Sequence, residues 1–287
     1  MLKRLINLCG SILVAAFDWL YDLANRLLGR SPRGACVVLA YHSVASSERD
    51  WFARQMDVLR THTTPVAANI ADLPNRHTRY SAVTFDDGLE NIVINALPVL
   101  AERMIPATLF LVTGALGTNP SWEYFGGDDP SQQRVMTEQQ LQTLSTELVT
   151  IGSHTMTHPM LPSLNRDSMK RELSGSRGKL EALSGREVKL FSFPYGAFDK
   201  SVVQACRDAR YERVFTALPV FAFQQPNEFV TGRVGVRPTD WPIEFRLKLA
   251  GAYRWLPYAF ALKRKTLCLF RLGHAPALVS QGETRGA

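Results

Sequence analysis

Two acidic residues and two histidines stand at spacings that suit a hydrolytic metal site. His154 and His158 are four residues apart in the segment SHTMTHP, and Asp86 and Asp87 are adjacent in TFDDG. Histidines at this spacing on a helical turn or tight loop can direct both rings to one cation. Adjacent side chains at the end of a strand point in different directions, so one acid can bind a metal while the other faces its water. We therefore expect Asp87, His154 and His158 as metal ligands and Asp86 as a general base.

Each half of this constellation also has a structural interpretation. The segment DDG alone suits a polar turn with aspartate as a helix cap, and two histidines alone are often incidental. Their joint occurrence after apolar runs favours the metal site. Gly88 would let the backbone pass close to that site.

The elements that must position these residues follow a regular alternation. Helical patterns separate seven apolar runs, which are CVVLAYHSV, SAVTFDD, ATLFLVT, ELVTIGSH, VKLFSFP, ERVFTAL and FVTGRVGV. Such alternation predicts a parallel α/β sheet of about seven strands, either closed as a barrel or open and doubly wound. Four polar motifs fall at the carboxyl ends of runs, where parallel folds place active sites: Tyr41-His42, Asp86-Asp87, His154 and Pro194-Tyr195.

Composition excludes several other classes of protein. With 287 residues, 46% hydrophobic and 21% charged, the chain should fold as one large α/β domain or two small ones. The net charge of +7 could indicate nucleic-acid binding, but the bases are scattered before residue 246 and no such motif accompanies them. We expect no nucleic-acid partner. No GxGxxG, P-loop or CxxC pair occurs, and the cysteines are far apart: Cys9, Cys36, Cys206 and Cys268.

Both ends of the chain have amphipathic character. Residues 5–17 form an apolar run too short to span a bilayer, and they lack a clear cleavage site for a signal peptide. Helical spacing joins Ile12, Ala16, Trp19, Leu20, Leu23 and Leu27, which predicts a helix that lies on a membrane or, more simply, packs on the domain. Residues 245–287 mix bases with aromatic residues, which suits an anionic membrane surface or a solvated helix covering the barrel.

Taken together, these motifs resemble the polysaccharide deacetylases with the NodB-homology domain, also called carbohydrate esterase family four. The likeness covers roughly residues 36–242 and includes YHSV, MTEQQL and FSFPYGAFD. Its most specific element is TFDDG followed by SHTMTHP. The resemblance implies a distorted (β/α) barrel that removes N-acetyl groups from an amino-sugar polymer or oligomer.

The resemblance also assigns roles to residues. It makes Asp86 the catalytic base and makes Asp87, His154 and His158 the ligands of a divalent ion, zinc above all, with cobalt, nickel or manganese as alternatives. Thr155 would brace the loop between the histidines. The backbone N–H of Tyr195 would stabilise the oxyanion. Trp241 matches an aromatic residue that walls the acetyl pocket.

Two positions depart from the family pattern. Many members have an arginine where this chain has Ser192, so we expect Arg233, in TGRVGV, to orient the base instead. The histidine of the last family motif is matched only by His274, which follows the basic stretch. We expect His42, at the end of the first strand, to be the general acid, with His274 as the alternative.

These interpretations divide the chain into three parts: an amphipathic helix (1–34), a deacetylase barrel (35–244) and a basic helical extension (245–287). We expect a cytoplasmic protein, peripheral at the inner membrane, with export as the alternative. A deformylase or deacetylase of a lipid-linked amino sugar would share the fold and metal. A carbohydrate-binding pseudoenzyme would use the barrel mouth for recognition only.

Overall fold

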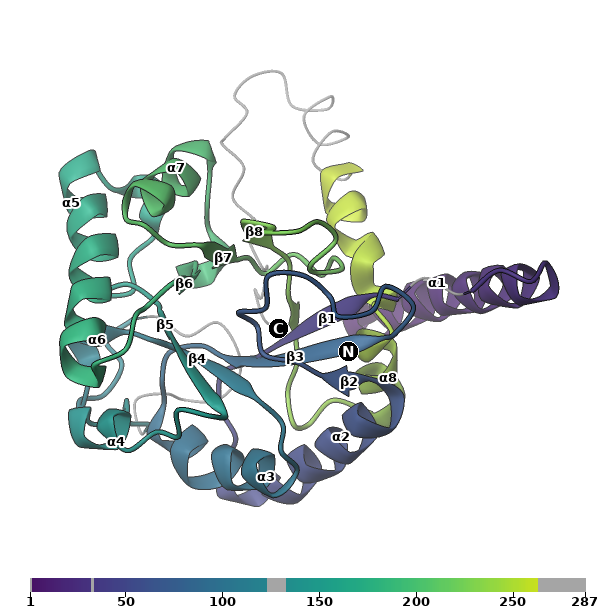
Figure 1. Cartoon of the computed structure of the whole chain (residues 1–287), viewed down its shortest axis with the longest axis horizontal. Coiled ribbons are helices and arrows are strands. Elements are labelled where there is room, and N and C mark those ends of the chain that lie inside the picture. The colour runs from purple at the N-terminus through teal and green to yellow at the C-terminus, as the bar shows by residue number, and fades with distance from the viewer. Residues whose placement is uncertain (1, 32–33, 123–132, 263–287) are drawn as a thin grey trace.

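The computed structural model describes residues 2–31, 34–122 and 133–262 (Figure 1). Within them a sheet of parallel strands curves around a small interior and helices cover its outside. The strands are β1 (Cys36–Tyr41), β2 (Thr64–Pro65), β3 (Tyr80–Phe85), β4 (Ala107–Leu111), β5 (Val149–Ser153), β6 (Leu190–Ser192), β7 (Arg213–Phe215), β8 (Val230–Thr231) and β9 (Val234–Gly235). The prediction of a distorted parallel (β/α) barrel is confirmed.

The barrel closes where the seventh predicted run divides into two strands. The order across the sheet is β8-β7-β6-β5-β4-β3-β1-β9, with β2 paired to the start of β3. Thus β8 and β9 lie at opposite ends of this order, although only Gly232 and Arg233 separate them in the chain. The short link brings the two ends of the sheet together, and it places Arg233 at the carboxyl ends of the other strands.

Alternation along the strands divides the core into two parts. In β4, Phe110 packs with Phe215 in a small cluster that also contains Cys36 and Val38. Their immediate neighbours along the strands, such as Val37 in β1 and Leu109 in β4, belong to the larger cluster beneath the helices. Because successive strand side chains point to opposite faces, the first cluster fills the barrel and the second joins barrel to helices.

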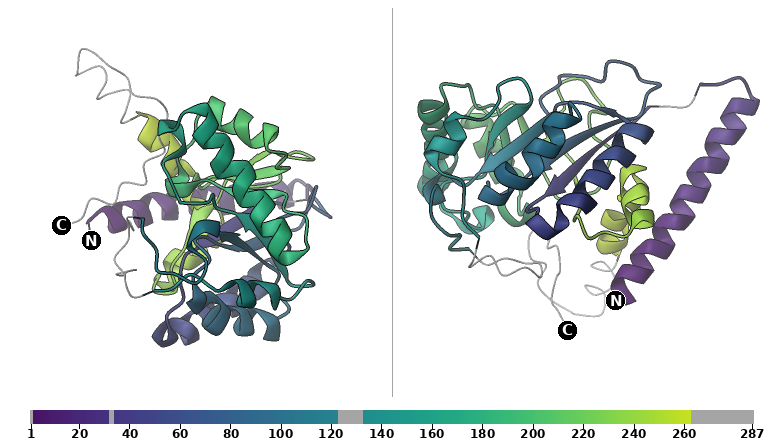
Figure 2. Two further views of the ribbon diagram at one scale, coloured as in Figure 1. Left: turned by 90° about the vertical axis from the view of Figure 1, so that its left-hand side faces the viewer. Right: turned by 90° about the horizontal axis from the view of Figure 1, so that it is seen from below.

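The helical segments alternate with the strands around the barrel (Figures 1 and 2). Local capping defines several ends, as at Thr137, which accepts the backbone N–H of Gln140 and so starts α4. The main helices are α1 (Leu2–Leu27), α2 (Arg49–His62), α3 (Leu97–Glu102), α4 (Glu138–Gln142), α5 (Arg166–Lys170), α6 (Ser176–Ser184), α7 (Lys200–Asp208) and α8 (Pro242–Leu249), with π-helical turns η2 (Ile92–Ala96) and η6 (Arg171–Gly175) and 3-10 turns η7 (Pro194–Gly196) and η8 (Ala252–Trp255).

The amino-terminal helix forms as predicted, but it docks through the opposite face. α1 lies against α8 and η8, and one end extends beyond the body (Figure 2). Its apolar side chains, expected to pack on the domain, are exposed; Leu20 and Leu27, for example, are 57% and 81% exposed. By length and composition alone α1 could cross a membrane, which the short apolar run did not predict, and signal sequences pass the same test.

The described part of the carboxyl-terminal extension packs on the body, which is one of the two arrangements expected for it. Phe245 is buried, and Lys248 forms ion pairs with Asp240 and Glu244, so neither is available to bind lipid. Arg254 likewise pairs with Asp18 of α1. Residues 263–287, which include Cys268 and His274, lie outside the described residues.

Candidate active site

The predicted site residues gather at the carboxyl ends of neighbouring strands. Asp86 and Asp87 follow β3, His154 follows β5, and Tyr195 lies in η7 just after β6. His42 follows β1, whose last residue pairs with Phe85 in the parallel register, so His42 stands next to the acidic pair. The barrel thus brings together residues that are more than a hundred positions apart in the chain.

Three side chains direct donor atoms toward one point. Asp87 Oδ1 lies 3.4 Å from His158 Nε2 and 3.6 Å from His154 Nε2. Ligand bonds of about 2.0–2.2 Å in a tetrahedral arrangement require donor separations of about 3.3–3.6 Å. All three residues are buried. Both separations to Asp87 lie in this range, and all three donor atoms lie within 4.8 Å of one another, so the cluster matches the ligand set predicted from sequence.

The hydrogen-bonding pattern of this cluster also indicates a bound cation. His154 Nδ1 donates to the Ser192 carbonyl at 2.8 Å, and a carbonyl can only accept, so Nε2 carries a lone pair toward Asp87. Asp87 Oδ1 is buried and has no hydrogen-bond partner among the described residues. Burying two hydrogen-bond acceptors face to face costs free energy unless a cation lies between them. A divalent metal ion fits the chemistry of this donor set.

Electrostatics leads to the same conclusion. Burial, assisted by the charge on Asp86, raises the pKa of Asp87 well above its ordinary value. Burial lowers the pKa of His154 to about 4, and burial with the nearby His154 lowers that of His158. The imidazoles are therefore neutral near pH 7, as metal ligands must be. A cation held by this carboxylate would favour its ionised form.

Asp86 has a different environment, because it is held by arginine. Arg233 donates to Asp86 Oδ1 at 2.8 Å and to Oδ2 at 2.7 Å, and both residues are buried. Burial alone would raise the pKa of Asp86, but the Arg233 charge and hydrogen bonds hold it well below the ordinary value. Asp86 is consequently ionised over the working range of pH.

Ser192 links this pair to the metal ligands. Its hydroxyl accepts from Arg233 at 2.7 Å and lies 3.3 Å from Asp86 Oδ2, while its carbonyl orients His154. Sequence reasoning treated Ser192 only as the place of a missing arginine. The structure gives it three supporting contacts, with Arg233, Asp86 and His154.

Ser192→Ala should lower kcat by less than about tenfold, because Arg233 keeps both bonds to Asp86 and the backbone carbonyl that orients His154 remains. Steady-state kinetics checks this expectation, with the thermal midpoint as a control for folding. A loss near that of removing the base itself would assign Ser192 a direct role.

Four residues of the site have an unusual backbone conformation. Asp87, Thr155, His158 and Tyr195 all have positive φ, between 59° and 72°. Such conformations cost about 1–3 kcal/mol each in residues other than glycine and persist only where surrounding contacts enforce them. Their concentration here marks a site whose geometry is imposed by the fold.

Thr155 and Glu172 supply contacts that hold the backbone of the loop between the histidines. Thr155 Oγ1 accepts the backbone N–H of His158 at 3.0 Å, as the family resemblance implied. Glu172, in η6, accepts the backbone N–H groups of Met156 and Thr157 at 2.8 and 3.0 Å. In the sequence Glu172 looks like an exposed helix charge, so no local signal could have identified it.

Aromatic rings flank His158 on two sides. The Trp122 ring stacks on it with centroids 4.8 Å apart, and the Tyr195 ring meets it edge-on at 4.5 Å. Trp122 lies in a loop without regular structure, which is why periodicity gave no reason to choose it. Both rings restrict the orientation of the imidazole.

The remaining predicted residues are placed less directly. His42 is exposed as a residue, yet loss of solvation around its ring lowers its pKa, and Asp86 opposes that shift. The guanidinium carbon of Arg4, in α1, lies 4.2 Å from the centroid of the Trp241 ring. The acid role of His42 and the pocket role of Trp241 stay predictions.

Comparison with known proteins agrees with the fold and the site. The sequence model of the polysaccharide deacetylase family matches residues 74–214, which include Asp86, Asp87, His154, His158 and Tyr195. The chain is 23% identical over 212 residues to YxkH of Bacillus subtilis, assigned to the polysaccharide deacetylases, covering 70% of this chain and 71% of YxkH. It is 29% identical to a chitooligosaccharide deacetylase of Sinorhizobium fredii, covering 54% of this chain and 61% of that protein.

A solved structure shares the architecture over most of the chain. IcaB from Ammonifex degensii superposes with a TM-score of 0.62 and 25% identity, covering 76% of this chain and 97% of IcaB. A parallel barrel with an Asp-His-His set at the carboxyl ends of its strands defines a class of hydrolases. The chain belongs to the polysaccharide deacetylase family, whose members act on amide C–N bonds of amino sugars.

Proposed function

We propose that this protein removes N-acetyl groups from the amino sugars of a polysaccharide or exopolysaccharide, with a divalent ion, zinc by preference, held by Asp87, His154 and His158. The observation that carries the proposal is the meeting of these three donor atoms beside the arginine-held carboxylate of Asp86. A bound ion would supply Lewis acidity and lower the pKa of a bound water.

The chain's own residues would divide the remaining work. Asp86 is ionised and can take a proton from the attacking water. The backbone N–H of Tyr195 would donate to the developing oxyanion, a contact that gains strength in the transition state. His42 would protonate the departing amine, and Trp241 would wall the acetyl group. Arg233 is a positioning residue, since it acts through Asp86.

Arg233→Met should move the acidic limb of the activity profile to higher pH. Removing the cation leaves burial to raise the pKa of Asp86, and a base must be deprotonated to act, so activity is lost at low pH and recovers as pH rises. Arg233→Lys keeps a charge and should shift the limb less.

Kinetics at several pH values, with melting curves, measures this effect. Breaking a buried pair costs about 3–5 kcal/mol, so the melts decide which variants are folded. An unchanged acidic limb in folded Arg233→Met would end the positioning role.

The function is tested by measuring acetate and formate released from chitin oligomers, poly-N-acetylglucosamine and lipid-linked amino sugars. Acetate release from a polymer or oligomer supports the proposal. Formate release from a lipid-linked sugar would favour the deformylase. A metal-loaded protein that binds these oligomers and releases neither acid would be a carbohydrate-binding pseudoenzyme.

We further propose that the protein acts on the cytoplasmic side of the inner membrane, as a peripheral protein. The exposed apolar residues of α1 support attachment. Detection in an exported, processed form would contradict this location without affecting the deacetylase assignment.

A further inference from the structure

The amino-terminal helix α1 has the reverse of the usual polarity of a surface helix. Arg4, Ser11, Asp18 and Asp22 turn toward the protein, together with the partly buried Leu8, Val14 and Ala15, while a broad apolar face is exposed. The exposed residues are Leu2, Leu5, Ile6, Ile12, Leu13, Phe17, Trp19, Leu20, Tyr21, Leu23 and Leu27. A water-soluble domain normally buries such a face and exposes the charged one.

Bonds along its length fix this orientation. Arg4 donates to Glu244 of α8 at 2.8 Å, Asp18 accepts from Arg254 at 2.7 Å, and Ser11 accepts from the Trp255 indole. The fit is close, since a side chain at Gly10 would collide with the Trp255 ring. The helix is therefore docked by a face on which these polar residues stand beside the partly buried Leu8, Val14 and Ala15.

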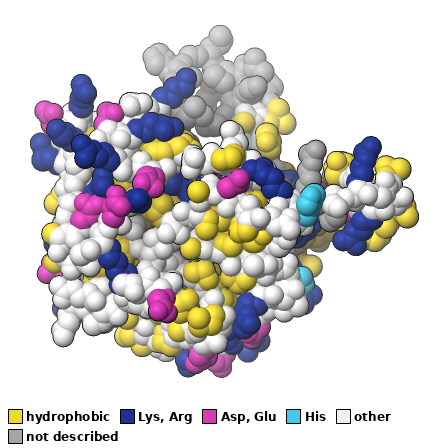
Figure 3. Space-filling model, viewed as in Figure 1, with side chains coloured by type: hydrophobic (Ala, Val, Ile, Leu, Met, Phe, Trp, Pro, Cys, Tyr) yellow, Lys and Arg dark blue, Asp and Glu magenta, His cyan; other side chains and the backbone are white. Residues whose placement is uncertain are grey.

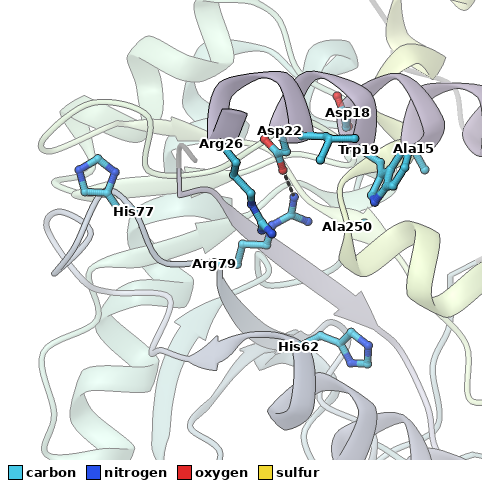
Figure 4. A pocket seen from close by; sticks show the side chains of 10 residues that line it. Ala15, Asp18, Trp19, Asp22, Arg26, His62, His77, Arg79 and Ala250 are labelled. Atoms are coloured by element: carbon cyan, nitrogen blue, oxygen red, sulfur yellow. Dashed lines mark hydrogen bonds and ion pairs between the residues drawn. The ribbon is translucent and has the colours of Figure 1, made fainter. Parts of the chain in front are cut away.

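The carboxyl-terminal half of α1 repeats the pattern. Figure 4 shows Asp22 bonded to Arg79 of the body, at 3.2 Å, with Arg26 reaching toward the same place. A cavity of about 520 Å³ lies here between helix and body, and its lining includes Asp18, Asp22, His62 and Arg79. Polar side chains of α1 thus face the body over several turns, beside the apolar Ala15 and Trp19 that also line the cavity.

The exposed apolar face continues onto the body. Leu13 and Phe17 share a hollow of about 550 Å³ with Val220 and Tyr258, and Tyr258 is itself 74% exposed. In Figure 3 the protruding end of α1 shows hydrophobic side chains next to Lys or Arg side chains. The apolar surface is therefore wider than one helix and is bordered by positive charge.

We propose that this surface is a membrane-binding face, with α1 lying in the lipid interface parallel to the bilayer. At 100° per residue the exposed apolar residues cover about half of the helix circumference, wider than the narrow seam by which two helices pair. Tyr21 suits the interface, and the exposed Arg30, just after α1, complements anionic headgroups.

A spanning orientation fits the structure less well. Crossing the bilayer would break the ion pairs of Arg4, Asp18 and Asp22 and carry carboxylates into hydrocarbon. Lying flat keeps every one of these bonds. The helix then presents only its apolar face to lipid.

Flotation of the full-length protein with vesicles of phosphatidylcholine and phosphatidylglycerol tests the proposal. The wild type should float at low and at high salt, because apolar burial supplies most of the binding. Leu13→Glu/Phe17→Glu should lower the partition coefficient at least about a hundredfold, since two largely exposed apolar side chains lose their transfer into lipid. Its melting temperature should be unchanged.

The matched control is Ile94→Glu/Met104→Glu, two exposed apolar residues on the body, which should float like the wild type. Flotation of the α1 variant, or failure of the wild type to float, overturns the proposal. The proposal is also overturned if the wild type does not bind vesicles but forms a dimer that Leu13→Glu/Phe17→Glu dissociates. The face would then pair two copies of the chain. Resistance of bound protein to alkaline carbonate would instead indicate a spanning helix and overturn the interfacial orientation.

Discussion

Asp86→Asn should reduce kcat by about 10³-fold while leaving metal content unchanged, within the range of 10²–10⁴ typical of a lost general base. Asparagine has the same shape and keeps an oxygen for Arg233, but it cannot accept a proton. Asp86 is absent from the three-residue donor set, so the metal should remain. The change therefore separates proton transfer from metal binding.

Turnover of an acetylated oligomer and metal content per chain measure this separation. Asp72→Asn, the same change in an exposed carboxylate paired with Arg76, is the matched control and should behave as wild type. Retention of more than about a tenth of kcat by Asp86→Asn would be incompatible with a base worth 10²-fold or more.

His154→Ala should lose both metal and activity. The change removes one of three donors and leaves Asp87 buried beside a single imidazole. Loss of a group that merely supports a ligand already weakens metal binding by about 10–100-fold, so loss of the ligand should exceed that range. Activity should fall to background at metal concentrations that saturate the wild type.

Metal titration followed by calorimetry measures the effect. His62→Ala, in an exposed histidine at the end of α2, serves as the control and should bind metal normally. Full metal content in folded His154→Ala would remove it from the ligand set.

The strands and the site motifs were predictable because both depend on local patterns. Apolar runs ending in polar residues located β1, β3, β5 and β6 together with the residues that follow them. Parallel strands meet at one edge, so residues at their carboxyl ends had to come together. The prediction of an Asp-His-His cluster needed no long-range detail.

Arg233 shows what the sequence left open. It was selected as a substitute for the arginine missing at position 192, but its contact with Asp86 joins residues 147 positions apart. That contact depends on the closure of the barrel between β8 and β9, where the sequence showed a single run. Topology, not local pattern, determines it.

The backbone conformation of the site was also beyond local signals. Gly88 was the residue expected to allow a close approach, yet Asp87 and His158 also adopt positive φ. Long-range contacts such as those of Glu172 impose these conformations, and no short window of sequence contains both partners.

For α1 the sequence predicted the helix but not its orientation. Periodicity shows that one face is apolar, and the usual expectation is that this face is buried. Ion pairs from Arg4, Asp18 and Asp22 to the body reverse the arrangement. Only the three-dimensional positions of their partners reveal this.

Acetate release from an N-acetylglucosamine oligomer, followed before and after a chelator strips the protein of metal, tests the central claim most directly. We predict that the metal-free protein releases no acetate, that stoichiometric zinc restores release, and that Asp86→Asn carrying the same zinc remains inactive. Undiminished acetate release from the fully metal-free protein would contradict the account.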